Sequence, residues 1–310
     1  MPQGSLRIKS ALSNVAVQYK NENYIASDVM GEIPVTKDAG YYWIYANDFR
    51  IEETKRGNKA LANMATWAAS TSTYTVQKHA LKDALSEEDR MNSDLPGSLD
   101  VDTTEYLTDK ILMRYEYEVH KLLFTTTTFS NNTTLTSATS WRYNTTTSAP
   151  IQNVLSATSV IQKFSGKRPN MAVMGWDVFA ALKENANVYG RIQYVERAMV
   201  TKELLAALFD LNAVNVGSAA YMNAGEGLET TTSQSYIWGA DCLIAYMDGA
   251  PGIKKPSAAV TFRVNEFGKP YRVKKWFSQD YDCDFIEVET KFGPRAVATS
   301  CAYLFKTAAL

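Results

Sequence analysis

The amino-acid sequence predicts an α+β protein, and three patterns lead to this fold class. Leu107, Ile111, Tyr115 and Val119 recur at the spacing of one face of a long helix. Residues 151–255 alternate helix-like and strand-like segments, which is typical of an α/β unit. In the remainder of the chain, apolar side chains alternate with polar ones, as they do in antiparallel strands with one buried face.

Residues 1–32 have a mixed polar composition that does not bury a core by itself. Before Tyr19 they contain Arg7 and Lys9 but no acidic residue. Such a segment is expected to form an extended arm that needs the surface of a partner.

Residues 33–78 predict a long β-hairpin that projects from the body. The run IPVTKDAGYYWIYANDF begins at Ile33, and a second β-rich run, STSTYTV, covers residues 70–76. β-Branched and aromatic residues favour strands, while the stretch between the runs is charged and contains Gly57. An isolated hairpin is marginally stable in water, so we expect a neighbouring subunit to cover it.

Aromatic and charged side chains of this hairpin, with the acids that follow it, are the candidate subunit contacts. Aromatic residues anchor many interfaces, and residues 86–109 contain eight acidic residues against one arginine. Complementary charges on two copies would strengthen their contact at low salt. The candidate interface set is Tyr42, Trp43, Tyr45, Phe49, Arg50, Glu52, Lys55, Arg56, Trp67, Glu87, Glu88 and Asp89.

The longest predicted element is a helix over residues 103–124, with Asp102 or Thr103 as its N-cap. Residues 125–149 are rich in Thr, Ser and Asn and predict extended or loop structure. The α/β unit that follows has these predicted elements: helix 151–164 ending at Gly166, strand 170–175, helix 176–185, a helix capped by Thr201, and strands 213–218 and 235–248.

The charge and cysteine content argue against several classes of protein. Thirty-two basic residues against 33 acidic ones give a net charge of -1, whereas proteins that wrap nucleic acid tightly carry an excess of Lys and Arg. Any DNA contact should therefore be loose or local. Cys242, Cys283 and Cys301 are too far apart to indicate a zinc site or a disulfide framework, and they are interpreted as reduced, apolar side chains. No signal peptide or membrane-spanning segment is predicted, so folding in a cytoplasm is expected.

The sequence offers little for catalysis, and we expect neither an enzyme nor a cofactor. No nucleophile elbow, zinc-protease, Walker or dinucleotide motif occurs. His79 and His120 have no nucleophile or carboxylate placed by the sequence to form a relay. Asp280, Asp282 and Asp284 would share one face of a strand and could bind a cation. Aspartates between two strands are, however, usual turn residues, and no metal site is predicted.

Six passages that follow one another over essentially the whole chain are similar to segments of one known protein family. They are IPVTKDAGYYWIYANDFRIEETKRG, TTEYLTDKILMRYEYEV, GKRPNMAVMGWDVFAAL, VTKELLAALFDLNAVNVGSAAY, YIWGADCLIAY and AYLFKTA. In this order they resemble the major capsid proteins of tailed bacteriophages with the Hong Kong 97 fold. The resemblance implies an N-terminal arm at 1–32, an extended hairpin (the E-loop) at 33–78, a peripheral domain with a spine helix at 79–150 and 256–310, and an α/β axial domain at 151–255.

The resemblance also implies a function, that of a coat protein forming hexamers and pentamers of an icosahedral head around double-stranded DNA. The implied partners are further copies of the chain, a separate scaffolding protein, a portal, a decoration protein and the packaged DNA, contacted non-specifically; no membrane is implied. The implied location is the virion, after synthesis and assembly in the host bacterial cytoplasm. Two alternatives stay open: an encapsulin-like compartment that encloses enzymes, and a soluble metal-dependent enzyme that uses Asp280, Asp282 and Asp284.

Overall fold

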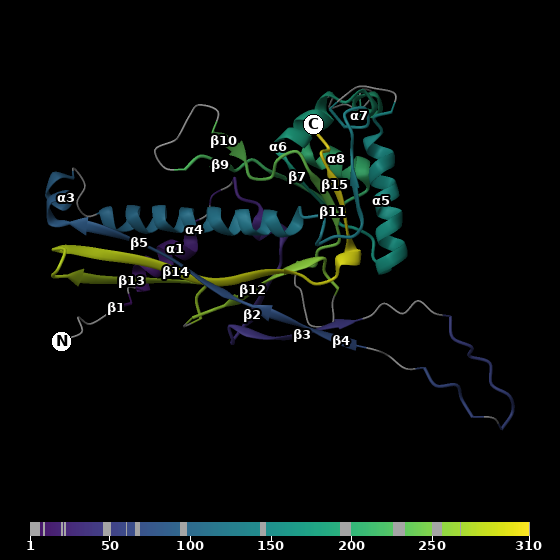
Figure 1. Ribbon diagram of the computed structural model, residues 1–310, viewed down its shortest axis with the longest axis horizontal. Coiled ribbons are helices and arrows are strands. Elements are labelled where there is room, and N and C mark those ends of the chain that lie inside the picture. Colours follow the sequence, from purple (N-terminus) through teal and green to yellow (C-terminus); the bar gives the residue numbers. More distant parts are fainter. Residues whose placement is uncertain are drawn as a thin grey trace.

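The computed structural model describes most of the chain. The described residues are 7–8, 10–19, 21, 23–45, 51–59, 61–65, 69–93, 98–142, 147–192, 200–225, 233–249, 256–266 and 268–309. They form an elongated layer of sheet and helix, a compact α/β unit at one end of it, and a hairpin that extends beyond the body (Figure 1).

The long sheet is organised around β14, which pairs with three other strands. One edge of β14 pairs antiparallel with β5, and the other edge pairs first with β13 and then with β12. β2 joins β12 in parallel, and β1 joins β13, so the sheet unites segments from both ends of the chain. Its six strands are β1 (Arg7–Ile8), β2 (Glu32–Val35), β5 (Gln77–Ser86), β12 (Ala259–Val264), β13 (Tyr271–Ser278) and β14 (Cys283–Ala296).

A long helix, α4 (Leu99–Leu123), lies along one face of this sheet (Figure 1). The apolar stripe predicted from the sequence is confirmed, because its side chains are buried in the main core. They are Leu107, Ile111, Tyr115, Val119 and Leu123.

The start of α4 differs from the prediction. The helix begins at Leu99 and Ser98 is its N-cap, so the prediction of Asp102 or Thr103 as N-cap was wrong. Asp102 lies in the first turn instead, where its carboxylate accepts a hydrogen bond from Ser98 Oγ at 2.9 Å. The helix N-terminus carries a partial positive charge, so an acidic residue is favourable at any position of the first turn. An acidic residue there therefore does not identify the N-cap.

The N-terminal segment packs on its own chain. α1 (Ser10–Gln18) contacts α4 and β13. In α2 (Ala26–Val29), the first and the last residue are buried. The Glu116 carboxylate of α4 accepts hydrogen bonds from the N–H groups of Ile25 and Ala26, at 2.9 and 2.8 Å. The expectation of an extended arm was therefore wrong for this stretch, since a buried carboxylate that no apolar pattern reveals holds it on the helix.

The compact unit is built on a second sheet with the strand order β6–β15–β11–β7–β8. The predicted caps are confirmed: Gly166 has a left-handed φ of 66° after α5, and Leu204 N–H donates to Thr201 Oγ1 at 3.3 Å. The strands are β6 (Asn132–Thr134), β7 (Met171–Gly175), β8 (Ala213–Gly217), β11 (Cys242–Ala245) and β15 (Ala302–Lys306). The helices are α5 (Pro150–Ser165), α6 (Trp176–Glu184), α7 (Ala186–Ile192) and α8 (Lys202–Phe209).

Two predictions for this unit differ from the structure. β6 and β15 fall in the ranges assigned to the peripheral domain, yet β15 pairs with β11 and β6 pairs with β15. The predicted strand 235–248 is two strands in different sheets: β10 (Gln234–Tyr236), which pairs with β9 (Ala220–Met222), and β11. The chain turns between them at Gly239, which has a φ of 54° next to the buried Trp238.

All three cysteines are buried thiols, as predicted. Burial raises the pKa of the Cys242 thiol, which keeps it protonated and unreactive. In the described part of the chain, no helix has the length and apolar character needed to cross a bilayer.

Candidate functional site

Among the described residues, a projecting hairpin carries several of the most exposed side chains. β3 (Ala39–Tyr45) and β4 (Ala69–Thr75) pair antiparallel along their whole length, so the two predicted strand runs do form a hairpin. It leaves the body near the α/β unit (Figure 1). The hairpin tip, residues 51–59 and 61–65, includes Ile51, Leu61 and Met64 with exposed fractions of 100%, 93% and 89%. Large apolar side chains that are this exposed on one short segment are available for a partner to cover.

The root of the hairpin is packed on the long sheet. The Tyr74 ring stacks on Phe262 of β12 with centroids 4.5 Å apart, and Tyr42 packs against the same ring at 5.6 Å. Gly293 of β14 lies directly beneath β4, because a Cβ added to it would be 2.3 Å from the carbonyl oxygen of Thr75. Close contacts therefore set the direction in which the hairpin leaves the body.

Alternation along β3 divides its aromatic residues into two sets. Tyr42 faces the root and contacts its own chain, although it was predicted as a subunit contact. Tyr41 and Trp43 point the other way, with exposed fractions of 78% and 51%. Trp43 stays a candidate contact, and Tyr41 lies exposed on the same side of the strand.

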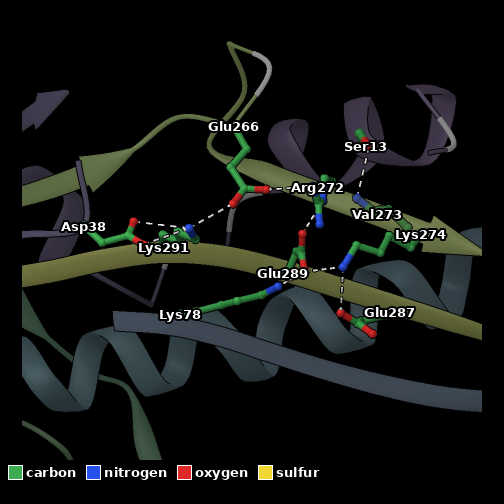
Figure 2. Close-up of polar contacts among 10 residues, drawn as sticks. All are labelled: Ser13, Asp38, Lys78, Glu266, Arg272, Val273, Lys274, Glu287, Glu289 and Lys291. Atoms are coloured by element: carbon green, nitrogen blue, oxygen red, sulfur yellow. Dashed lines mark hydrogen bonds and ion pairs between the residues drawn. The ribbon is translucent and has the colours of Figure 1, made fainter. Parts of the chain in front are cut away.

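A network of ion pairs lies on the sheet face that carries the hairpin root (Figure 2). At its centre, the Glu289 carboxylate is 2.5 Å from Nζ of both Lys78 and Lys274, and it also pairs with Arg272. Glu289 occupies a polar position in the alternating sequence of β14, but its exposed fraction is 2% because these cations enclose it. Burial by itself raises the pKa of Glu289, but hydrogen bonds from Lys274 and Lys78 and the charge of Arg272 lower it to about 2.

A second branch of the network reaches the base of the hairpin. Lys291 Nζ lies 3.2 Å from Asp38 Oδ1 and 3.2 Å from Glu266 Oε1, and Glu266 also pairs with Arg272 at 2.9 Å. Asp38 directly precedes β3, so ion pairs run without a break from the hairpin base to Glu289 (Figure 2). Hydrogen bonds to Asp38 and Glu266 raise the pKa of Lys291, which keeps this lysine charged.

Acid should weaken this network through Glu289. The folded-state pKa is lowered from 4.5 to about 2, so the ionised carboxylate stabilises the fold above pH 4.5, and this contribution is lost as the pH falls towards 2. We expect the free energy of unfolding, measured with urea, to fall more steeply over this range for the wild-type chain than for Glu289→Gln. Equal slopes for the two proteins would assign the acid sensitivity to other carboxylates.

Lys291→Met should loosen the hairpin base without unfolding the body. Methionine keeps the apolar stem but removes the cation that Asp38 and Glu266 share. Because Asp38 is largely exposed, only about 0.5–1 kcal/mol of stability should be lost. Amide hydrogen exchange in β3 and β4 should accelerate about fivefold, while exchange in the second sheet stays unchanged. Unchanged exchange in the hairpin would mean that its aromatic root holds it alone.

The far end of the long sheet is closed by the short helix α3 (Glu87–Asn92). Asp89 N–H donates to Ser86 Oγ at 3.1 Å, and Ser86 N–H donates to Asp89 Oδ2 at 3.1 Å. These two residues form a capping box, and the hydrogen bonds from Ser86 lower the pKa of Asp89. Asp89, which was predicted as a subunit contact, therefore caps its own helix, and it is exposed together with Glu87 and Glu88.

Two cations hold α3 on the sheet. Arg90 pairs with Asp100 at 2.7 Å and with Asp284 at 3.0 Å, and Lys275 pairs with the same two carboxylates at 2.7 and 3.1 Å. Asp282 lies in the β13–β14 turn with a φ of 47°. Asp280, Asp282 and Asp284 thus serve a turn and an ion-pair cluster, and no metal-binding group of His, Cys, Asp or Glu occurs among the described residues.

The other predicted contact residues divide by position. The charged ones on the hairpin tip are exposed: Glu52, Lys55 and Arg56. Phe49, Arg50 and Trp67 lie outside the described residues. The side chain of Tyr45 on β3 also lies outside them. Both histidines stack on aromatic rings, His79 on Phe292 and His120 on Phe124, and burial lowers the pKa of both.

Comparisons with known proteins connect this architecture to a family. The model of a family described as phage capsid protein matches residues 69–296. The major capsid protein of Burkholderia phage BcepMu is 23% identical over 242 residues, which cover 77% of this chain and 76% of the relative. The major capsid protein of Pseudomonas phage JBD67 is 27% identical over 254 residues, which cover 80% of both chains.

Solved structures share the fold at lower identity. A phage-related protein from Bordetella bronchiseptica RB50 has a TM-score of 0.78 at 18% identity, and the match covers 99% of both chains. The capsid protein of cyanophage P-SCSP1u has a TM-score of 0.61 at 9% identity, covering 93% of this chain and 89% of that one. A virus-like particle from Pyrococcus furiosus has a TM-score of 0.58 at 10% identity, covering 96% and 97%.

The fold is therefore one that a phage capsid protein shares. The chain belongs to the phage capsid protein family. Its function is that of a phage major capsid protein, a structural component of the virion, which confirms the function predicted from the sequence. The compartment alternative is not favoured by these relatives.

Proposed function

We propose that the chain is a Hong Kong 97-type subunit that forms hexamers and pentamers of an icosahedral head around double-stranded DNA. The observation that carries this proposal is the hairpin, whose root is packed on the sheet while Ile51, Leu61 and Met64 at its tip are exposed. A fixed root with an apolar tip is suited to lie over a neighbouring copy, and repeated contacts of this kind close into rings.

The proposed domains follow the two sheets. The hairpin is the E-loop, the long sheet with α4 is the peripheral domain, and the α/β unit is the axial domain at the centre of each ring. This axial domain takes β6 and β15 in addition to residues 151–255. The N-terminal arm at 1–32 would act mainly by packing on the peripheral domain, through α1 and α2.

Shortening the hairpin tests this assembly. Replacing residues 46–68 by Asn-Gly joins β3 to β4 through a two-residue turn that hairpins favour, so the tip is lost while the root remains. With a co-expressed scaffolding protein, we expect closed particles of uniform diameter from the full chain in negative-stain electron microscopy. The shortened chain should keep its circular dichroism spectrum and remain as small, slowly sedimenting species. Closed particles from the shortened chain would overturn the role of the tip.

The remaining partners are proposed on the same basis. They are a separate scaffolding protein, a portal, a decoration protein and non-specifically contacted DNA, and assembly takes place in the host bacterial cytoplasm. The net charge of -1 supports only loose contact with the DNA. Nuclease treatment of particles purified from phage-producing cells tests the contents: protected double-stranded DNA supports the head, while enclosed protein without DNA supports the compartment.

A further inference from the structure

A groove of about 620 Å³ lies between α4 and the two-stranded ribbon of β9 and β10, on the face of α4 that points away from the long sheet (Figure 1). One wall is a single face of α4, whose lining residues are three or four positions apart, so their side chains are neighbours. They are Lys110, Met113, Arg114 and Tyr117. The ribbon supplies the other wall. This α4–ribbon groove is far from the hairpin and takes no part in its root.

The lining of the α4–ribbon groove is largely apolar. The rings of Tyr117 on α4 and Tyr221 on β9 pack with centroids 5.8 Å apart, so the two walls are held at a fixed separation. Met113 adds a partly buried side chain, and Met222 on β9 has an exposed fraction of 43%. Methionine adapts its shape to what packs on it and makes favourable contacts with aromatic rings. A concave site of this size and lining suits a large apolar side chain.

Two cations give the α4–ribbon groove a positive charge. Lys110 and Arg114 are exposed and lie one helical turn apart. Arg114 Nε donates a hydrogen bond to Glu118 Oε1 at 2.8 Å, yet its side chain is still 60% exposed, and a guanidinium has further N–H donors. Lys110 Nζ lies 5.4 Å from the ring centroid of Tyr106, which holds it over the outer face of α4. Carboxylates are ligands that both side chains bind well.

The charge pattern along α4 favours an acidic protein segment over nucleic acid. A DNA duplex needs a row of cations for its phosphates. Asp102 and Asp109 precede Lys110 on the same helix, so a duplex that lay along α4 would meet like charge within about two turns. Tyr117, Tyr221 and the methionines also offer little to a phosphate. A short acidic segment uses the two cations and the apolar lining together, and opposite charges around an apolar centre set its register.

We propose that the α4–ribbon groove binds a short acidic segment of a partner protein. A large apolar side chain of that segment packs against Tyr117 and Met222, and its carboxylates pair with Lys110 and Arg114. This inference goes beyond the proposed function and does not depend on the formation of rings. Its lining comes from one chain, so a free subunit binds the segment as well as an assembled one does.

Selection from an mRNA-displayed library of random peptides tests the chemistry of the partner. The full chain is the target, and the Lys110→Glu variant removes peptides that bind elsewhere. We expect the enriched peptides to carry an excess of Asp and Glu around Leu, Phe or Trp. The best of them, labelled with fluorescein, should bind the full chain with a Kd on the order of 10 µM at about 150 mM salt, measured by fluorescence anisotropy. Enrichment of basic or uncharged peptides, or of none, would overturn the proposal.

Single substitutions locate the bound peptide. Lys110→Glu should weaken its binding at least about tenfold, and Met222→Ser about fivefold, because each removes one of the two kinds of contact. The matched control is Lys121→Glu, an equal change of charge on the same helix. Lys121 is exposed and lies roughly 16 Å along α4 from Lys110, beyond the range of its charge at this salt, so binding should change less than about twofold. All variants should keep the circular dichroism spectrum of the wild-type chain.

Three results would contradict a site for an acidic protein segment. Equal affinities for the three variants would place the peptide elsewhere on the molecule. Displacement of the peptide by a short DNA duplex, with weaker duplex binding by Lys121→Glu, would assign this face of α4 to nucleic acid. Dissociation of chain oligomers by the peptide, measured by sedimentation velocity, would make the groove a contact between copies of the chain. Each result leaves the proposed shell function intact, since that function is tested by particle formation.

Discussion

Glu116→Ala should lower the free energy of unfolding by about 3–5 kcal/mol. The Glu116 carboxylate is buried on α4 and accepts three hydrogen bonds, from Ile25 N–H at 2.9 Å, Ala26 N–H at 2.8 Å and Trp238 Nε1–H at 2.6 Å. Alanine would leave all three donors buried without an acceptor, and each unsatisfied donor costs roughly 1–3 kcal/mol. The same side chain joins the N-terminal segment to the turn between β10 and β11, so one substitution should loosen both.

Urea denaturation measures this effect, and hydrogen exchange locates it. Exchange at residues 23–30 and 237–240 should accelerate more than exchange in β13 and β14. The control is Glu118→Ala on the same helix, where an ion pair with the exposed Arg114 is lost and the change should stay below about 1 kcal/mol. Similar losses from Glu116→Ala and Glu118→Ala would show that the three donors find other partners, such as water.

The sequence predicts those parts of the fold that depend on local patterns. The stripe from Leu107 to Val119 and the caps at Gly166 and Thr201 follow from helical spacing and from the hydrogen-bonding needs of helix ends. The N-terminal segment could not be predicted in this way. Its place on α4 depends on Glu116, a charged residue beside an apolar stripe, and nothing within residues 1–32 points to that partner.

The same reasoning explains what was missed in the candidate site. Glu289 alternates with apolar residues as a solvent-facing acid would, and it is buried because Lys78, Arg272 and Lys274 meet it from two other strands. The aromatic run of β3 predicts a strand but not which face is covered. That face is decided by Phe262, which lies far along the chain and packs on Tyr42. The character of each residue could thus be read from the sequence, whereas its contact partners could be identified only from the register of the paired strands.

The end of the long sheet that carries α3 and the β13–β14 turn shows this limit most clearly. Met91, Phe277 and Tyr281 come from a helix, a strand and a turn that are separated in the sequence, and each alone would be an ordinary apolar residue. Only the pairing of β5, β13 and β14 brings them to one end of the molecule. The acids Glu87 and Glu88 were found from the sequence because they are adjacent, which is a local signal.

Gly293→Ala should have a large effect on assembly, although Gly293 lies in the long sheet and not on the hairpin tip. An added Cβ would lie 2.3 Å from the Thr75 carbonyl oxygen and 3.2 Å from Val76 Cα, so the backbone of β4 must move away from the sheet. Displacing β4 also weakens the stacking of Tyr74 on Phe262, and overpacking of this kind costs about 1–3 kcal/mol. The body should still fold, because the displaced segment belongs to the hairpin and not to the main core.

A small shift at the root becomes a larger one at the tip, since the paired strands move together as a lever. We therefore expect Gly293→Ala to lower the yield of closed particles at least about tenfold, or to give open or irregular shells, because rings close only at one angle between subunits. Gly190→Ala is the matched control, as a Cβ there meets no atom within 4 Å, and its particles should equal wild type. If Gly293→Ala lowers stability as expected but assembles normally, the tip finds its partner from more than one hairpin direction, and the partner surface rather than the root sets the geometry of the shell.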